Sequence, residues 1–243
     1  MAALQLSGVG SAMFDLVFVV VVPLALFVIT GCPALSTMQT PATVPKGGLR
    51  VGVGFERIGT AEKDSNGYIT TKVVGQFEIN ARLGVADNFD LGAKLYLFGV
   101  EVGGKYQFAK GDFEAAVAPA IDYGSFGSTD YDGGTETTST MYLHLPLLLG
   151  YKVADSLEIA FGPRAIYMSK RDSREGSWGQ SSFTSTGFTA GGFASIQLRI
   201  GKAFWIAPEI NVYKPLDAGT TGMLWQGGLA LLFGGASDAM GPP

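Results

Sequence analysis

His144 is the residue with the most recognisable chemistry in this chain, because it is the only histidine. A general base needs a carboxylate to orient it and a nucleophile within hydrogen-bond reach. The local run Tyr142-Leu143-His144-Leu145-Pro146 contains no serine, and the expected strand tips carry no pair of aspartates. We therefore expect a structural histidine and no enzyme, with a hydrolase on the loop face as the weaker alternative.

A second candidate for chemistry is an acidic, glycine-containing run, Asp130-Tyr131-Asp132-Gly133-Gly134-Thr135-Glu136. Its carboxylates alternate as in the first half of a calcium loop, although Gly134 stands where such loops place Asp or Asn. Asp130, Asp132 and Glu136 are therefore a weak metal candidate, and a solvated acidic loop tip is the expected alternative. We expect no cofactor: the glycines at 52 and 54 precede no helix and form no nucleotide loop.

The only cysteine, Cys32, follows an apolar run of 14 residues from Leu16 to Ile29 that contains Pro23. This run is short for a bilayer-spanning helix of ~20 residues and suits a signal-peptide core. Ile29-Thr30-Gly31-Cys32 resembles the lipobox of bacterial lipoproteins, whose cysteine is diacylated and becomes the first residue of the mature chain. The resemblance implies lipoprotein-processing enzymes as partners and an anchor in the inner leaflet of the outer membrane. Residues 1–15 hold no Lys or Arg, so an uncleaved membrane anchor and a free thiol remain alternatives.

The composition favours a β protein with little water-facing surface. The chain has 35 Gly, 12% aromatic residues and 16% charged residues, against a usual ~25% charged. Asp15 is the only charged residue before Cys32, so the mature chain has a formal charge of −3, compared with −4 for the whole sequence. That charge is too small to imply a nucleic-acid partner.

Alternation of polar and apolar residues begins at Leu49 and places successive side chains on opposite faces of a sheet. Gln76-Phe77-Glu78-Ile79-Asn80-Ala81-Arg82-Leu83 is the clearest stretch. We predict ten strands, most of them with the ~9–11 residues that cross a bilayer, and no helix after the signal segment. Their ranges are 49–57, 73–84, 88–97, 99–108, 112–123, 139–152, 156–168, 184–200, 203–213 and 222–233.

The predicted connections sort into short and long ones at opposite ends of the sheet. Short joins follow the second, fourth, sixth and eighth strands, whereas residues 58–72, 124–138, 169–183 and 214–221 form long polar ones. The join near Phe98 breaks this rule. Bacterial outer-membrane barrels have short periplasmic turns, longer outer loops and an even number of strands. The chain resembles these small barrels, which implies an antiparallel up-and-down transmembrane β-barrel of about ten strands, with eight as an alternative.

Aromatic side chains on the apolar face fall at two heights, as in the interfacial girdles of membrane barrels. Phe89, Phe108, Phe113, Tyr151, Phe204 and Phe233 lie at the short-turn end, and Tyr123, Tyr167 and Trp225 lie at the long-loop end. The opposite face carries charges that would cost roughly 2–4 kcal/mol each at the bilayer midplane. We therefore place them in the lumen as a paired network: Glu78, Arg82, Asp90, Lys94, Glu101, Lys105, Arg164, Arg199 and Glu209.

The last predicted strand, Gln226-Gly227-Gly228-Leu229-Ala230-Leu231-Leu232-Phe233, resembles the terminal signature that the barrel assembly machinery recognises. This resemblance implies that machinery as a partner, together with outer-membrane lipid and lipopolysaccharide. Lys170, Arg171 and Arg174 in a predicted loop could meet lipopolysaccharide phosphates, although a mixed-charge exposed loop is the default. Four prolines inside predicted strands, at 119, 146, 163 and 208, lead us to expect bulges there.

Four segments follow from these patterns: a signal peptide (1–31), a lipidated tether (32–48), an outer-membrane barrel (49–233) and a tail (234–243). A ten-stranded barrel has a narrow lumen, since open aqueous channels appear at 16–18 strands. We expect a largely plugged bacterial outer-membrane protein with a structural or surface-interaction role through its loops. The alternatives, in order, are a narrow solute pore, a barrel enzyme and a soluble lipid-binding barrel.

Overall fold

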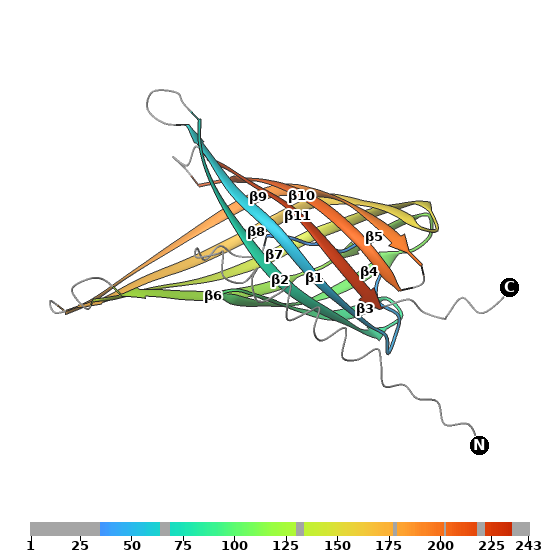
Figure 1. Ribbon diagram of the computed structural model, residues 1–243, viewed down its shortest axis with the longest axis horizontal. Helices are drawn as coiled ribbons and strands as arrows, with labels where there is room; N and C mark the ends of the chain where they lie inside the picture. The colour runs from blue at the N-terminus through green and yellow to red at the C-terminus, as the bar shows by residue number, and fades with distance from the viewer. Residues whose placement is uncertain are drawn as a thin grey trace, which may run out of the picture. The chain divides into compact units, whose positions relative to one another are not determined.

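A computed structural model describes residues 35–63, 69–129, 134–176, 179–201, 203–217 and 222–234 (Figure 1). All of them belong to one compact unit, residues 31–243. Cys32, Asp130 and Asp132 lie outside the described residues. No helix among the described residues is long and apolar enough to cross a membrane.

Eleven β-strands make up the unit, and each follows a stretch of alternating polar and apolar residues. They are β1 (Leu49–Lys63), β2 (Ile69–Ala86), β3 (Phe89–Tyr96), β4 (Gly99–Ala109), β5 (Phe113–Val117), β6 (Ala120–Thr129), β7 (Thr135–Ala154), β8 (Leu157–Gly176), β9 (Gly179–Ile200), β10 (Phe204–Pro215) and β11 (Gly222–Gly234).

The strands form a closed antiparallel barrel. Apart from β5 and β6, each strand pairs with its neighbour in the chain, and β1 pairs with β11 from Arg50↔Gly234 to Glu62↔Gly222, which joins the first strand to the last. β5 and β6 both lie between β4 and β7, so they share one position and the barrel has ten positions. The predicted all-β antiparallel barrel is confirmed. Closure leaves no edge within the wall, so every strand there finds hydrogen-bond partners on both sides.

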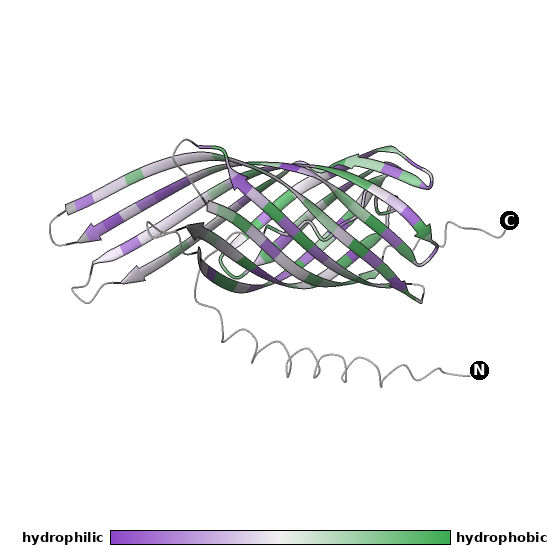
Figure 2. Ribbon diagram, turned by 90° about the horizontal axis from the view of Figure 1, so that it is seen from above, coloured by the Kyte–Doolittle hydropathy of each residue, from purple (hydrophilic) through white to green (hydrophobic). Residues whose placement is uncertain are grey.

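Several strands are longer than predicted, and they lengthen at the same end. Residues 58–63, 124–129 and 169–176 belong to strands, although the sequence analysis assigned them to loops. These stretches are rich in Ser, Thr and charged residues and lack the one-sided apolar alternation that marks the wall (Figure 2). The prediction was wrong there because backbone pairing extends past the part of each strand that has an apolar face.

The strand prolines coincide with interruptions of the ladder, as a residue without an N–H requires. Pro119 separates β5 from β6. The β7–β8 ladder skips from Pro146↔Arg164 to Leu149↔Phe161, opposite Pro163, and the β10–β9 ladder skips past Pro208. The bulges predicted at these prolines were wrong: the register shifts in the described ladders lie near the short turns, at Gly84/Ala86, Gln107/Ala109 and Lys152/Ala154.

Residues 35–48, which we call the lumen segment, run inside the barrel. Leu35, Ser36, Met38, Thr40 and Val44 are each at most 4% exposed. This differs from the predicted tether at 32–48. A tether needs water around its backbone, whereas here side chains of the barrel wall meet the backbone of the segment. The segment ends at the short-turn end, where Gly47, in the left-handed region with φ 76°, donates its N–H to the carbonyl of Gly84.

Candidate functional site

The lumen gathers the charged residues that the sequence analysis assigned to the inner face. Glu78, Asp90, Lys94, Lys105, Arg164 and Glu209 are buried, and Arg82, Glu101 and Arg199 are half-buried. Since buried charges need partners, the contacts of these residues show what the lumen is built to hold.

At the long-loop side of the lumen, the wall binds the first described residue of the segment. Arg164 and Tyr213 both donate hydrogen bonds to the carbonyl oxygen of Leu35, Tyr213 at 3.2 Å. The Leu35 side chain packs in a buried cluster with Ile58, Ile166 and Tyr213.

At mid-height, carboxylates accept the N–H and O–H groups of the segment. Ser36 donates its N–H to Glu56 (3.1 Å) and its hydroxyl to Glu78 (2.6 Å). Lys94 donates to the Ser36 carbonyl at 2.7 Å, and its Nζ lies 3.5 Å from Glu78 and 3.6 Å from Glu101. The charges here therefore pair partly with one another and partly with the segment.

Glu209 holds the next two residues. It accepts the Thr37 N–H (2.6 Å), the Thr37 hydroxyl (2.7 Å) and the Met38 N–H (2.6 Å), and it also accepts from Asn211 at 2.7 Å. Met38 has φ 44°, in the left-handed region that non-glycine residues seldom adopt. The hydrogen bond to Glu209 and the burial of the Met38 side chain against Ala207, Ala230 and Leu232 fix this conformation.

Nearer the short-turn end, a buried lysine donates hydrogen bonds to carbonyl groups of the segment. Lys105, which is fully buried, donates to the carbonyls of Thr40 (2.9 Å) and Ala42 (2.6 Å). Asp90 accepts the Val44 N–H at 3.0 Å and the Arg82 Nε–H at 2.7 Å. Thus the wall supplies acceptors for N–H groups and donors for carbonyls along the whole segment.

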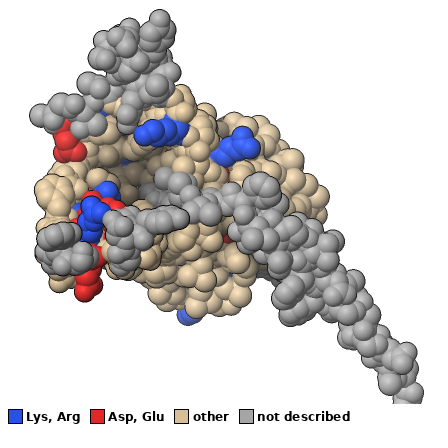
Figure 3. Space-filling view, turned by 60° about the vertical axis from the view of Figure 1, so that its left-hand side comes forward, with Lys and Arg blue, Asp and Glu red and all other residues tan. Residues whose placement is uncertain are grey.

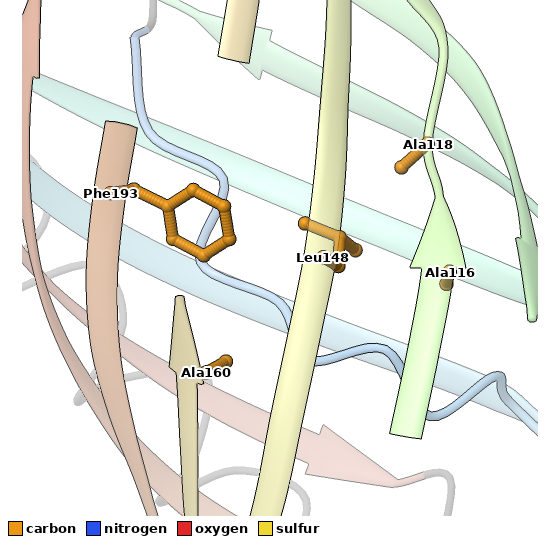
Figure 4. Close-up of a cluster of buried hydrophobic side chains, with 5 residues drawn as sticks. All are labelled: Ala116, Ala118, Leu148, Ala160 and Phe193. Atoms are coloured by element: carbon orange, nitrogen blue, oxygen red, sulfur yellow. The ribbon is translucent and has the colours of Figure 1, made fainter. Parts of the chain in front are cut away.

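An apolar patch on the inner wall faces the lumen from β5, the join between β5 and β6, β7, β8 and β9. It is formed by Ala116, Ala118, Leu148, Ala160 and Phe193 (Figure 4). Small side chains dominate it, which leaves room for the segment. An ideal Cβ on Gly150 would lie 2.8 Å from Pro41 of the segment. Two cavities beside the segment measure about 10 and 20 Å³. Each is the size of one or two water molecules.

His144 lies in this lumen with Asp122 and Glu101, and one ligand atom from each lies within 4.8 Å of the others. Arg164 Nη2 lies 2.8 Å from His144 Nδ1, and a guanidinium can only donate. The neutral ring therefore carries its proton on Nε2 and offers no lone pair there to a metal. The facing atoms Nε2, Asp122 Oδ2 and Glu101 Oε2 have no protein hydrogen-bond partner.

The outward face of the wall carries the aromatic residues singled out by the sequence. At the short-turn end, Phe113 pairs with Tyr151 across the ladder, and the rings of Phe204 and Phe233 lie 5.1 Å apart. Phe108, Phe113, Tyr151 and Phe233 are 46–55% exposed there, and Phe89 is half-buried. At the long-loop end Tyr123 is 51% exposed, and Tyr167 and Trp225 are half-buried. Figure 3 shows few charged side chains on the visible wall.

Beyond the long-loop end, four strands continue as a sheet that we call the projecting sheet (residues 124–129, 135–141, 169–176 and 179–188). β9 last pairs with β10 at Thr189↔Pro215, and β6 last pairs with β4 at Gly124↔Gly99. The outer sides of residues 180–187 and 126–129 therefore have no neighbouring strand among the described residues. Residues 180–187, Gln-Ser-Ser-Phe-Thr-Ser-Thr-Gly, include no charge and no proline.

Charged residues of the projecting sheet interact locally. Asp172 accepts a hydrogen bond from the Thr138 hydroxyl at 2.6 Å and lies 2.9 Å from Lys170 Nζ. The hydrogen bond from Thr138, followed by that from Lys170, lowers the pKa of Asp172 below its ordinary value. Arg171 and Arg174 pair in register with Ser139 and Glu136. Glu136 is the only member of the weak metal candidate within the described residues.

Comparison with known proteins locates no sequence relative: no protein-family profile and no curated protein matches the chain. Solved structures with a similar fold include Ail, the attachment invasion locus protein of Yersinia pestis, in complex with the heparin analogue sucrose octasulfate (TM-score 0.45, 12% identity, 78% of this chain and 99% of that one). The translocator domain of the autotransporter NalP from Neisseria meningitidis gives a TM-score of 0.46 at 11% identity, covering 76% and 88%. The outer membrane protease OmpT from Escherichia coli gives 0.44 at 6% identity, covering 82% and 98%. Likenesses of this size assign no activity to the chain.

Sequence reasoning found the inward charges but missed what they bind. No pattern within residues 35–48 indicates a buried segment. The available signal was the lumen itself: many charges face inward in a barrel too narrow for an open aqueous channel, and buried charges need partners. Asn211 and Tyr213, which contact the segment directly or through Glu209, were outside the predicted network.

Proposed function

We propose that this protein is a bacterial outer-membrane β-barrel whose lumen is closed by its own N-terminal segment and whose projecting sheet binds extended polypeptides outside the cell. Three features support the proposal: the apolar outer wall, the filled lumen and the unpaired edges of the sheet. The third carries the binding role.

The outer wall matches a bilayer in chemistry and height. Large apolar side chains point outward along every strand of the wall, for example Leu95 (58% exposed), Ile210 (56%) and Leu145 (57%). Val51 pairs with Phe233 of the lower aromatic ring, and Gly59 pairs with Trp225 of the upper one. Eight residues separate these levels on β1, which is about 26 Å along the strand. With strands tilted by ~40° to the barrel axis, the levels are ~20 Å apart along that axis. The apolar band of such barrels is ~25 Å tall.

The filled lumen supports a scaffold in preference to an open pore or an enzyme. The lumen segment occupies the axis, and the two cavities beside it hold one or two waters each. A larger cavity of about 280 Å³ lies at the short-turn end and is lined by Glu158, Gln197 and Arg199. Of the His144–Asp122–Glu101 cluster, His144 and Asp122 are at most 3% exposed and Glu101 is half-buried, so little of it is accessible to a substrate. We therefore assign no catalytic role, and a narrow pore remains the second candidate, since withdrawal of the segment would leave a polar channel.

The edge of β9 carries the binding role. Natural sheets protect exposed edges with Lys, Pro, bulges or covering loops. Residues 180–187 contain no Lys and no Pro, and their pairing with β8 has no bulge. Phe183 on this strand is 67% exposed. Unpaired N–H and carbonyl groups in a row bind an added strand, while neighbouring side chains select it.

The test compares peptide binding by two variants, one with a lysine on the unpaired edge strand and one with a lysine on an interior strand of the same sheet. Phe183→Lys adds a gatekeeper to the edge strand, whereas Ser173→Lys adds one to β8, which is paired on both sides. Binding of the purified barrel to an array of extended, β-forming peptides should be lost in the first variant and kept in the second. Equal binding by both variants, or no binding by the unmodified protein, would contradict the proposal.

A further inference from the structure

The lumen segment has a direction, which its contacts define in order. Leu35 meets Arg164 and Tyr213, Thr37 meets Glu209, and Thr40 meets Lys105. The hydroxyl of Thr43 then donates to the carbonyl of Asp87 in the short turn between β2 and β3. The chain therefore descends through the barrel toward the short-turn end, turns at residues 45–48, and rises again as β1.

The upper end of the segment lies at the height of the long-loop aromatic ring. Leu35 packs against Ile58, which neighbours Gly59, the partner of Trp225. Ile58 is nine residues from Leu49, the start of β1. Nine residues at ~3.3 Å with a tilt of ~40° place Leu35 ~23 Å above the short-turn end.

Chain length then limits where Cys32 can be. Only Pro33 and Ala34 separate it from Leu35, and three residue steps of at most ~3.6 Å each leave the two α-carbons at most ~11 Å apart. The short-turn end is about twice as far from Leu35 as this reach. The lumen between them is filled by the segment itself.

From this geometry we infer that the chain enters the barrel from the long-loop end, so that Cys32 and any acyl group on it are held on the outer side of the membrane. The inference rests on the proposed outer-membrane placement, in which the short turns face the periplasm. It replaces the sequence expectation that a lipid on Cys32 would lie in the inner leaflet. The entry of the chain into the barrel and the projecting sheet then lie on the same side of the membrane.

Labelling of single introduced cysteines on intact cells tests this arrangement. The full chain carries Ala34→Cys or Pro33→Cys as reporters, and a membrane-impermeant biotin maleimide is the probe. Ser182→Cys in the projecting sheet is the outer control, Asp155→Cys in the β7–β8 turn is the periplasmic control, and the unmodified chain gives the background from Cys32. A gel-mobility change on heating confirms that each variant forms a barrel.

We expect at least one reporter to label on intact cells as fully as Ser182→Cys, while Asp155→Cys labels only after the outer membrane is permeabilised. If neither reporter labels on intact cells although Ser182→Cys does, the inferred direction is wrong. If Ser182→Cys itself fails to label on intact cells, the proposed orientation in the outer membrane is wrong, and the inference falls with it.

Discussion

The two faces of the barrel wall are built from the same strands but depend on different partners. Outward side chains such as Ile210 contact lipid or detergent, and this apolar contact does not depend on a particular arrangement of partner atoms. Inward side chains such as Glu209 each satisfy particular N–H, O–H or carbonyl groups of one internal segment. The comparison teaches that the lumen, not the outer face, is where a single substitution has the larger effect.

The largest contrast is expected between neighbours on β10. Glu209→Ala leaves two backbone N–H groups and the Thr37 hydroxyl without an acceptor in a buried site, so it should lower the free energy of unfolding by about 3–5 kcal/mol. Ile210→Ala, 56% exposed in the native barrel, should cost under ~1 kcal/mol in detergent, which contacts this side chain in both the folded and unfolded chain. Thermal unfolding of the two variants measures the difference, and Glu209→Gln should be intermediate. Similar losses for Glu209→Ala and Ile210→Ala would remove the distinction between the faces.

A smaller contrast is expected at the adjacent pair Arg82 and Leu83. Arg82 donates to Asp90, but Asp90 also accepts the Val44 N–H and lies 3.6 Å from Lys105 Nζ. Arg82→Ala should therefore lower the free energy of unfolding by about 2 kcal/mol, less than the full loss of a buried pair. Leu83, 48% exposed, should tolerate Ala with a change under ~1 kcal/mol. The reverse order in melting temperature would mean that the inside and outside of the barrel have been exchanged.

The smallest effect is expected in the projecting sheet and depends on pH. The pKa of Asp172 is lowered in the folded protein, so its stabilisation is present above the ordinary value of 3.8 and is lost as the pH falls through the folded value. Hydrogen exchange of the β7–β8 pairing near Thr138↔Asp172 should accelerate over that range, beyond the change seen in Asp172→Asn, with no change in the barrel. An identical pH response in Asp172→Asn would show that this carboxylate does not stabilise the sheet.

The sequence predicted the wall well because the wall obeys local rules. Alternation from Leu49 onward identified every barrel position, although residues 112–123 were predicted as one strand and Pro119 divides them into β5 and β6. The strand extensions escaped prediction because residues such as 169–176 are polar on both faces. The burial of residues 35–48 escaped it because that segment has no periodicity, and its environment comes from Glu56, Lys105 and Glu209, which are distant in sequence.

Single-channel recording in planar bilayers tests most directly whether the barrel is closed by its own segment. The full chain should show no steady conductance, whereas a variant lacking residues 35–44 should open a channel, because the wall charges would then line a water-filled lumen. Heat-modifiable migration on a gel verifies that the shortened chain still forms a barrel. A silent bilayer with the folded shortened chain, or equal conductance from both proteins, would contradict closure by the lumen segment.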